Sequence, residues 1–102
     1  MSFQIRRMIA ADHPSLPGHF PDRPIVPGVL ILDEVIGVLA EWRSTDLVTK
    51  ISSAKFLAPL EPGEWFSIRF HDPTEADSVD FVCRSGSRDI VQGRLLVQRR
   101  SI

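Results

Sequence analysis

Three chemically capable groups lie within fifteen positions of one another in this sequence. They are a histidine, His19, an aspartate, Asp33, and between them Gly28 with Val29, which open an apolar segment. An imidazole can act as a general base and a carboxyl group as a general acid. Backbone N–H groups at the start of a helix can stabilise the oxygen of a polarised carbonyl group. The spacing therefore predicts acid–base chemistry beside a bound carbonyl group.

Asp33 falls on an apolar side of the segment from Gly28 to Trp42. At about 100° per residue it shares a face with Val29, Leu30, Ile36, Gly37 and Ala40, whereas Glu34 and Glu41 form a solvated stripe. A carboxyl group in apolar surroundings either finds a partner or keeps its proton, and one that keeps its proton is a candidate general acid. The alternative is that Asp33 caps or hydrogen-bonds a neighbouring loop.

His19 lies in a segment dominated by proline. Five prolines occur between Pro14 and Pro27, and each removes a backbone N–H and disfavours helix at the residue before it. We therefore expect an extended, irregular loop that holds the imidazole in place at small entropic cost. Two alternatives stay open: a purely structural role for His19, and a polyproline II ligand for the groove of a partner.

A central helix and several strands are predicted to position these groups. Pro27 precedes the helix from Gly28 to Trp42, which is apolar nearly all round and so is expected to be wrapped by other structure. Strands are predicted at residues 3–9, 47–60, 64–70, 78–84 and 89–99, separated by turn-forming residues. The expected class is α+β, with one helix against a curved antiparallel meander of about five strands.

Composition narrows the range of functions. The chain has 102 residues and a net charge of −1, so we expect one domain over residues 1–102 and no nucleic-acid partner. One cysteine, Cys83, cannot form an intrachain disulfide, and its place in a strand indicates a buried, inert thiol. No signal peptide or membrane-inserting stretch is visible, so the expected location is cytoplasmic. No histidine or cysteine cluster has zinc spacing, so no metal site is predicted.

A resemblance becomes specific over residues 18–35, GHFPDRPIVPGVLILDEV. This run is similar to the active-site segment of the beta-hydroxyacyl carrier-protein dehydratases, with its Gly-His-Phe loop, spaced prolines and Pro-Gly-Val before a central helix. The similarity continues more loosely through residues 55–63, KFLAPLEPG, and the short chain resembles the small stand-alone dehydratases of aryl-polyene and related lipid pathways. The resemblance implies the hotdog fold, a helix wrapped by an antiparallel sheet, and a homodimer or larger oligomer.

The resemblance also assigns roles to individual residues. His19 matches the catalytic histidine, Asp33 the catalytic carboxylate, and Gly28 with Val29 the N–H groups that bind the thioester carbonyl; Phe20 joins them as a substrate-binding residue. The implied reaction removes water from a 3-hydroxyacyl thioester on the phosphopantetheine of an acyl carrier protein and gives a trans-2-enoyl thioester. It needs no cofactor. The branch of the family with Asp at this position also isomerises its product, but the residues around Asp33 resemble the Glu branch, so isomerisation stays open.

Two other functions fit the same resemblance. A hotdog thioesterase would use Asp33 to activate water, and a non-catalytic acyl-binding module would keep the fold without turnover. Four aromatic residues, Phe56, Trp65, Phe66 and Phe70, are expected in the core, with one or two of them lining an acyl tunnel. A basic C-terminal segment with Arg84, Arg88, Arg94, Arg99 and Arg100 is a candidate docking surface for an acidic carrier protein.

Overall fold

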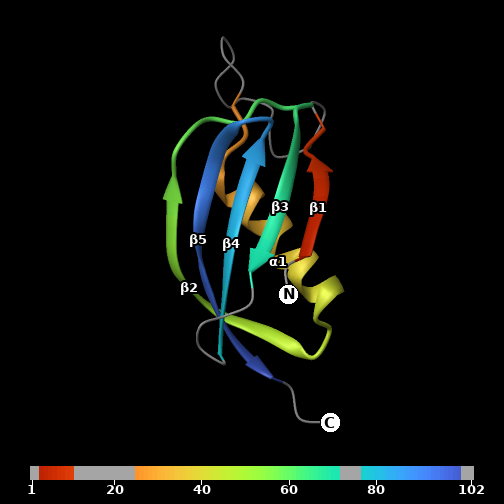
Figure 1. The fold of residues 1–102 in the computed structure, drawn as a ribbon, viewed down its shortest axis with the longest axis vertical. Helices are drawn as coiled ribbons and strands as arrows, with labels where there is room; N and C mark the ends of the chain where they lie inside the picture. Colours follow the sequence, from red (N-terminus) through yellow and green to blue (C-terminus); the bar gives the residue numbers. More distant parts are fainter. Residues whose placement is uncertain (1–2, 11–24, 72–76, 100–102) are drawn as a thin grey trace.

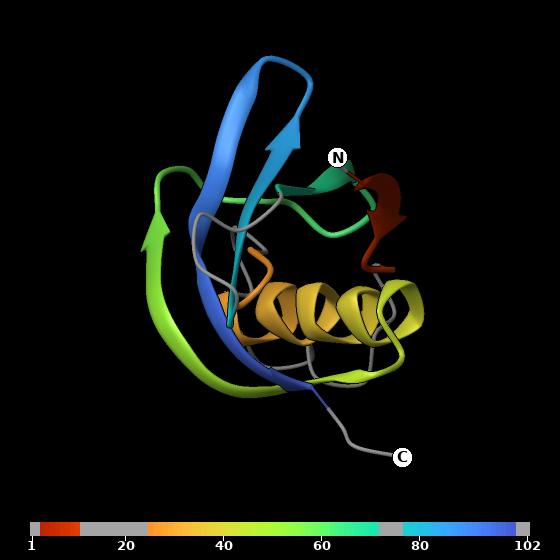
Figure 2. The ribbon, with the colours of Figure 1, turned by 60° about the horizontal axis from the view of Figure 1, so that its bottom comes forward.

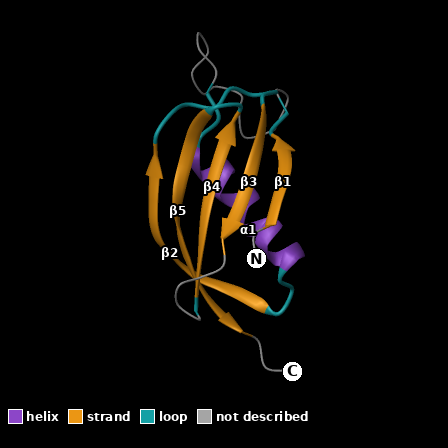
Figure 3. Cartoon of the chain, in the orientation of Figure 1, coloured by secondary structure: helices purple, strands orange, loops and turns teal. Residues whose placement is uncertain are grey.

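The computed structural model describes residues 3–10, 25–71 and 77–99 of the chain, apart from the side chain of Arg99. Its elements are β1 (Phe3–Met8), α1 (Gly28–Trp42), β2 (Asp46–Phe56), β3 (Trp65–His71), β4 (Ser78–Ser85) and β5 (Arg88–Arg99). The strands form one antiparallel sheet in the order β1-β3-β4-β5-β2 (Figures 1 and 3). The predicted α+β class, with five strands and one helix, is confirmed.

Two details differ from the prediction. The strand expected over residues 47–60 ends at Phe56, because the next residues leave the ladder: the N–H groups of Leu57 and Ala58 both donate to the carbonyl of Ile90. Pro59 then has no N–H to offer a neighbouring strand. The meander is also limited to β3, β4 and β5, since β2 pairs with β5 and not with β3.

The sheet curls around α1, which lies across its concave face (Figure 2). The helix buries Ile31, Val35, Val38 and Leu39 against the inward-facing side chains of the sheet. Trp42 ends the helix in an aromatic stack between Phe3 and Phe70, with ring centroids 5.0 and 5.4 Å apart. No helix within the described residues has the length and apolar character needed to cross a membrane.

Alternation along the strands decides which side chains are buried. Phe66 and Phe70 face α1 and are buried, as predicted, and so is Cys83, whose burial raises the pKa of its thiol to about 12. Trp65 was expected in the core, and this prediction is wrong. It stands on the opposite face of β3, half exposed, with the Arg6 guanidinium 4.9 Å from the centre of its ring.

Candidate active site

The helix α1 begins without a side-chain cap. Pro27 occupies the N-cap position with φ −58° and ψ 140°, and a proline has no side-chain oxygen to accept from the first N–H groups. The N–H of Leu30 donates to the carbonyl of Pro27, 3.0 Å away, but those of Gly28 and Val29 find no acceptor among the described residues. Within the described part of the chain, these two donors at the positive end of the helix dipole are not used by a protein acceptor.

These donors lie beside an apolar pocket of about 360 Å³. Its walls are the start of α1 and the segment from Leu57 to Leu60, with Phe56 at one side. The Phe56 ring packs directly on the helix start, so close that a Cβ at Gly28 would lie 2.6 Å from its Cζ atom. The glycine is thus required by the close approach of this ring. Half of the Phe56 surface remains exposed, which corrects its expected place in the core.

His19 and Phe20 lie outside the described residues, and so do the other residues of the proline-rich segment between Ala10 and Ile25. The described chain on both sides of that segment is held near the pocket. The N–H of Val26 donates to the carbonyl of Leu60 at 2.8 Å, and the N–H of Gly63 donates to the carbonyl of Ile9 at 2.8 Å. On one side of that segment Val26 is therefore bonded to the wall of the pocket, and on the other side Ile9 is bonded to Gly63, three residues beyond the wall.

Asp33 does not sit in a buried apolar environment within the chain, contrary to the sequence prediction. The buried face of α1 is centred on Ile31 and Val35, and Asp33 is about 200° around the helix from Ile31. The predicted stripe exists, but its members Val29, Asp33, Gly37 and Ala40 are exposed, with Val29 63% exposed. Asp33 also points about 140° away from Gly28, so one chain does not aim it at its own helix start.

The two other acids of α1 face β1. Glu41 forms an ion pair with Arg7 at 3.0 Å, and Glu34 approaches the same guanidinium at 3.8 Å. Both glutamates keep much of their surface in water, so the predicted solvated stripe is confirmed, with the addition that it ties the helix to the first strand.

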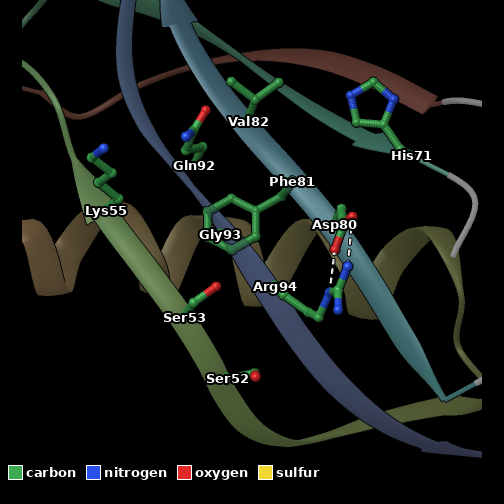
Figure 4. A pocket seen from close by; sticks show the side chains of 10 residues that line it. All are labelled: Ser52, Ser53, Lys55, His71, Asp80, Phe81, Val82, Gln92, Gly93 and Arg94. Carbon is green, nitrogen blue, oxygen red and sulfur yellow. Dashed lines mark hydrogen bonds and ion pairs between the residues drawn. The ribbon is translucent and has the colours of Figure 1, made fainter. Parts of the chain in front are cut away.

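A larger hollow, of about 660 Å³, lies on the face of the sheet away from α1 (Figure 4). Its centre is an ion pair in which Arg94 Nε lies 2.7 Å from Asp80 Oδ1, and this contact lowers the pKa of the Asp80 carboxyl group. Lys55 and His71 also line this hollow, and none of its lining residues belongs to α1. We therefore take the smaller apolar pocket, which Gly28 at the start of α1 helps to line, as the candidate site.

A family model for ApeI-like dehydratases, described as ApeI dehydratase, matches residues 1–94. The chain belongs to the ApeI-like dehydratase family. Among curated relatives, the 3-hydroxyacyl-[acyl-carrier-protein] dehydratase FabZ of Histophilus somni (strain 2336) is 34% identical over 71 residues, which cover 60% of this chain and 46% of that protein. FabZ of Chlamydia muridarum is 31% identical over 120 aligned positions that cover 99% of this chain and 76% of the relative.

A solved structure supports the fold. The dehydratase heterocomplex ApeI:P from Xenorhabdus doucetiae superposes with a TM-score of 0.83 over 96% of this chain and 88% of that one, at 22% identity. The hotdog fold expected from residues 18–35 is confirmed. The chain spans about half the length of the Histophilus relative, so the substrate and partners of that whole protein do not transfer to it directly.

Two features of the family member were not foreseen from the sequence. Three of the five arginines considered for docking already have acidic partners: Arg84 pairs with Asp89, Arg88 with Glu64 and Arg94 with Asp80. The remaining two, the side chain of Arg99 and all of Arg100, lie outside the described part of the chain. The segment from Leu57 to Leu60 was also given no role, although its membership of the matched run at residues 55–63 was a signal that it belongs to the site.

Proposed function

We propose that this ApeI-like chain, paired with a second copy of itself, removes water from a 3-hydroxyacyl thioester carried on the phosphopantetheine of an acyl carrier protein. The observation that carries the proposal is the uncapped start of α1, which presents two N–H groups beside an apolar pocket. A thioester carbonyl can accept from such donors while its acyl chain occupies an apolar wall.

The reaction requires one group that accepts a proton and one group that donates a proton. His19 takes the proton from C2, and the N–H groups of Gly28 and Val29 stabilise the negative charge that develops on the thioester oxygen. The C3–O bond then breaks as Asp33 gives its proton to the departing hydroxyl group. The products are the 2-enoyl thioester and water. His19 ends protonated and Asp33 ionised, and proton exchange with solvent restores both groups.

Asp33 serves the site of the other subunit in this proposal. It faces away from its own helix start and lies on an exposed stripe with Val29, so a second chain must cover it. A long strand edge that no other described strand covers supplies the contact. β2 has eleven residues and pairs only with β5 among the described strands, and Leu47, Ile51 and Phe56 on it are exposed. Such an edge is a template for pairing with another strand, here β2 of the second copy.

Complementation between two variants tests the reaction and the shared site together. His19→Ala and Asp33→Asn should each abolish the ultraviolet-monitored interconversion of 3-hydroxyacyl and 2-enoyl thioester, while circular dichroism shows that both still fold. Co-expressed chains that pair at random should recover about a quarter of wild-type activity, because half of the dimers are mixed and each mixed dimer holds one intact site.

Each result has a distinct meaning. No recovery on mixing, with each variant inactive alone, would place His19 and Asp33 of one chain in the same site. Release of free thiol without enoyl product would indicate a thioesterase and overturn the dehydratase. If the folded wild type is active only when a different hotdog chain is added, the second subunit of the site is that other chain and not a second copy, as in the ApeI:P heterocomplex.

A further inference from the structure

Glu64 and Arg88 form a charged cluster immediately behind the pocket wall. Arg88 Nη2 lies 2.9 Å from Glu64 Oε1 and 2.8 Å from Oε2, and it also donates to the carbonyl of Pro59 at 3.1 Å. Pro59 belongs to the wall. The guanidinium therefore joins β5, the residue before β3 and the wall of the pocket in one set of contacts.

Two further contacts fix the glutamate. Its carboxylate accepts from the hydroxyl of Ser85 at 2.6 Å and from the backbone N–H of Glu61 at 3.0 Å. The Ser85 bond, followed by the Glu61 bond and the Arg88 contacts, lowers the pKa of Glu64 below its ordinary value. The carboxylate thus stays charged at neutral pH and keeps Arg88 in the orientation that reaches Pro59.

We propose that Glu64 and Arg88 are positioning residues for the thioester site, acting through the segment from Leu57 to Leu60. Three backbone hydrogen bonds and the buried side chain of Leu60 also hold this segment: the N–H groups of Leu57 and Ala58 bond to Ile90, and the carbonyl of Leu60 bonds to Val26, just before the helix start. Movement of the wall would therefore reach the N–H donors through Val26. The identity of the substrate in this inference rests on the proposed function, whereas the support that Arg88 gives to the wall rests on the geometry alone.

We expect loss of the Glu64–Arg88 pair to displace the wall of the pocket and to leave the free energy of unfolding nearly unchanged. Arg88 is 47% exposed and Glu64 25% exposed, and ion pairs in contact with solvent contribute little to the free energy of folding. A small displacement of a binding wall can still change activity, because the substrate must be held near its reactive geometry. A variant that loses activity without losing stability would therefore distinguish a positioning role from a purely structural one.

The β4–β5 hairpin offers a matched control. Arg84 pairs with Asp89 at 2.7 Å and is 49% exposed, against 47% for Arg88, but its contacts stay within the hairpin and β3, and none reaches the wall. Arg88→Ala should lower kcat/KM for the acyl thioester on the order of fivefold, with a higher KM and a lower kcat, because the N–H donors that the wall holds in place stabilise the transition state. Arg84→Ala should leave both at wild-type values, and the two variants should melt at similar temperatures.

Amide hydrogen exchange supplies a readout that does not need turnover. Protection of the Val26 and Leu57 amides should fall in Arg88→Ala and in Glu64→Ala, without a further fall in the double variant, because the two side chains act as one unit. Protection and KM that match those of Arg84→Ala would overturn the inference, and effects that add in the double variant would also contradict it. A wild type without turnover would refute the proposed function, and exchange would still decide whether the cluster holds the wall.

Discussion

Gly28→Ala is the substitution whose effect follows most directly from the geometry of the site. A Cβ at this position would lie 2.6 Å from Phe56 Cζ and 2.7 Å from Cε1, whereas ordinary contacts begin near 3.4 Å. The tip of the ring must therefore move by about 0.8 Å, or the helix start must shift by the same amount. Because the ring is half exposed, it can swing outward at a cost of about 1 kcal/mol.

Stability and activity should respond differently to this change. Alanine is a better helix former than glycine by up to about 1 kcal/mol, which offsets the displacement of the ring, so the free energy of unfolding should stay within about 1 kcal/mol of wild type. The N–H donors and the pocket mouth are disturbed directly. A misplacement of this size at a reacting centre can cost about a hundredfold, so we expect kcat/KM for the hydroxyacyl thioester to fall by roughly 10- to 100-fold.

Two companion variants isolate the contact with Phe56. Gly37→Ala makes the same change on the same helix where a Cβ meets nothing within 4 Å of the described chain. Because Gly37 lies on the side of α1 assigned to the second copy, this variant is a reference for stability only. In Gly28→Ala/Phe56→Ala the obstructing ring is absent, and the effects of the single changes should not add. Urea denaturation and steady-state kinetics measure both quantities. The reasoning would be refuted by a Gly28→Ala protein with wild-type kcat/KM and the same gain in stability as Gly37→Ala.

Three further predictions concern the sheet. Gly93→Ala should lower the free energy of unfolding by about 3 kcal/mol in urea titrations, because its Cβ would collide with the backbone carbonyl oxygen of Ser53, which cannot rotate away. Acid should weaken the fold: Glu64 and Asp80 have pKa values below their ordinary 4.5 and 3.8, so the stability they add above those values is lost as pH falls through the lower folded pKa. Glu64→Gln with Asp80→Asn should flatten the urea midpoint against pH in this range, and an unchanged slope would contradict the assignment. Cys83 should resist a thiol reagent at pH 8 until urea unfolds the chain, and rapid labelling of folded protein would contradict its burial.

The helix and most strand positions could be predicted from the sequence because they depend on local patterns of residues. The helix from Gly28 to Trp42 has the predicted bounds, and Phe66 and Phe70, which were expected in the core, are buried on the inner face of β3. Trp65 shows the limit of this reasoning. It was expected in the core with the other aromatic residues, but it lies on the outer face of β3 against the guanidinium of Arg6.

The wall of the pocket was missed for a different reason. Its restraints connect Pro59 to Arg88 and Leu60 to Val26, residues that lie about thirty positions apart in the chain. A charge count treated the arginines of β4 and β5 as one basic surface, because it could not tell which of them would meet an acid across the sheet. Three of them do, and one of these contacts supports the wall.

Asp33 shows how a correct periodicity can lead to a wrong environment. The helical period groups Val29, Asp33 and Ala40 on one side of α1, and the structure agrees that they share a side. The helical period alone does not predict which apolar side of α1 packs against the sheet. The helix has more apolar surface than the concave face of one sheet can bury. The sheet covers the side of Ile31 and Val35, which leaves Val29 and Asp33 outside. A general acid that gives its proton within a water-excluded site must have that side covered. The surplus apolar surface of the helix and the exposed edge of β2 therefore point to the same requirement, a second chain that completes the site.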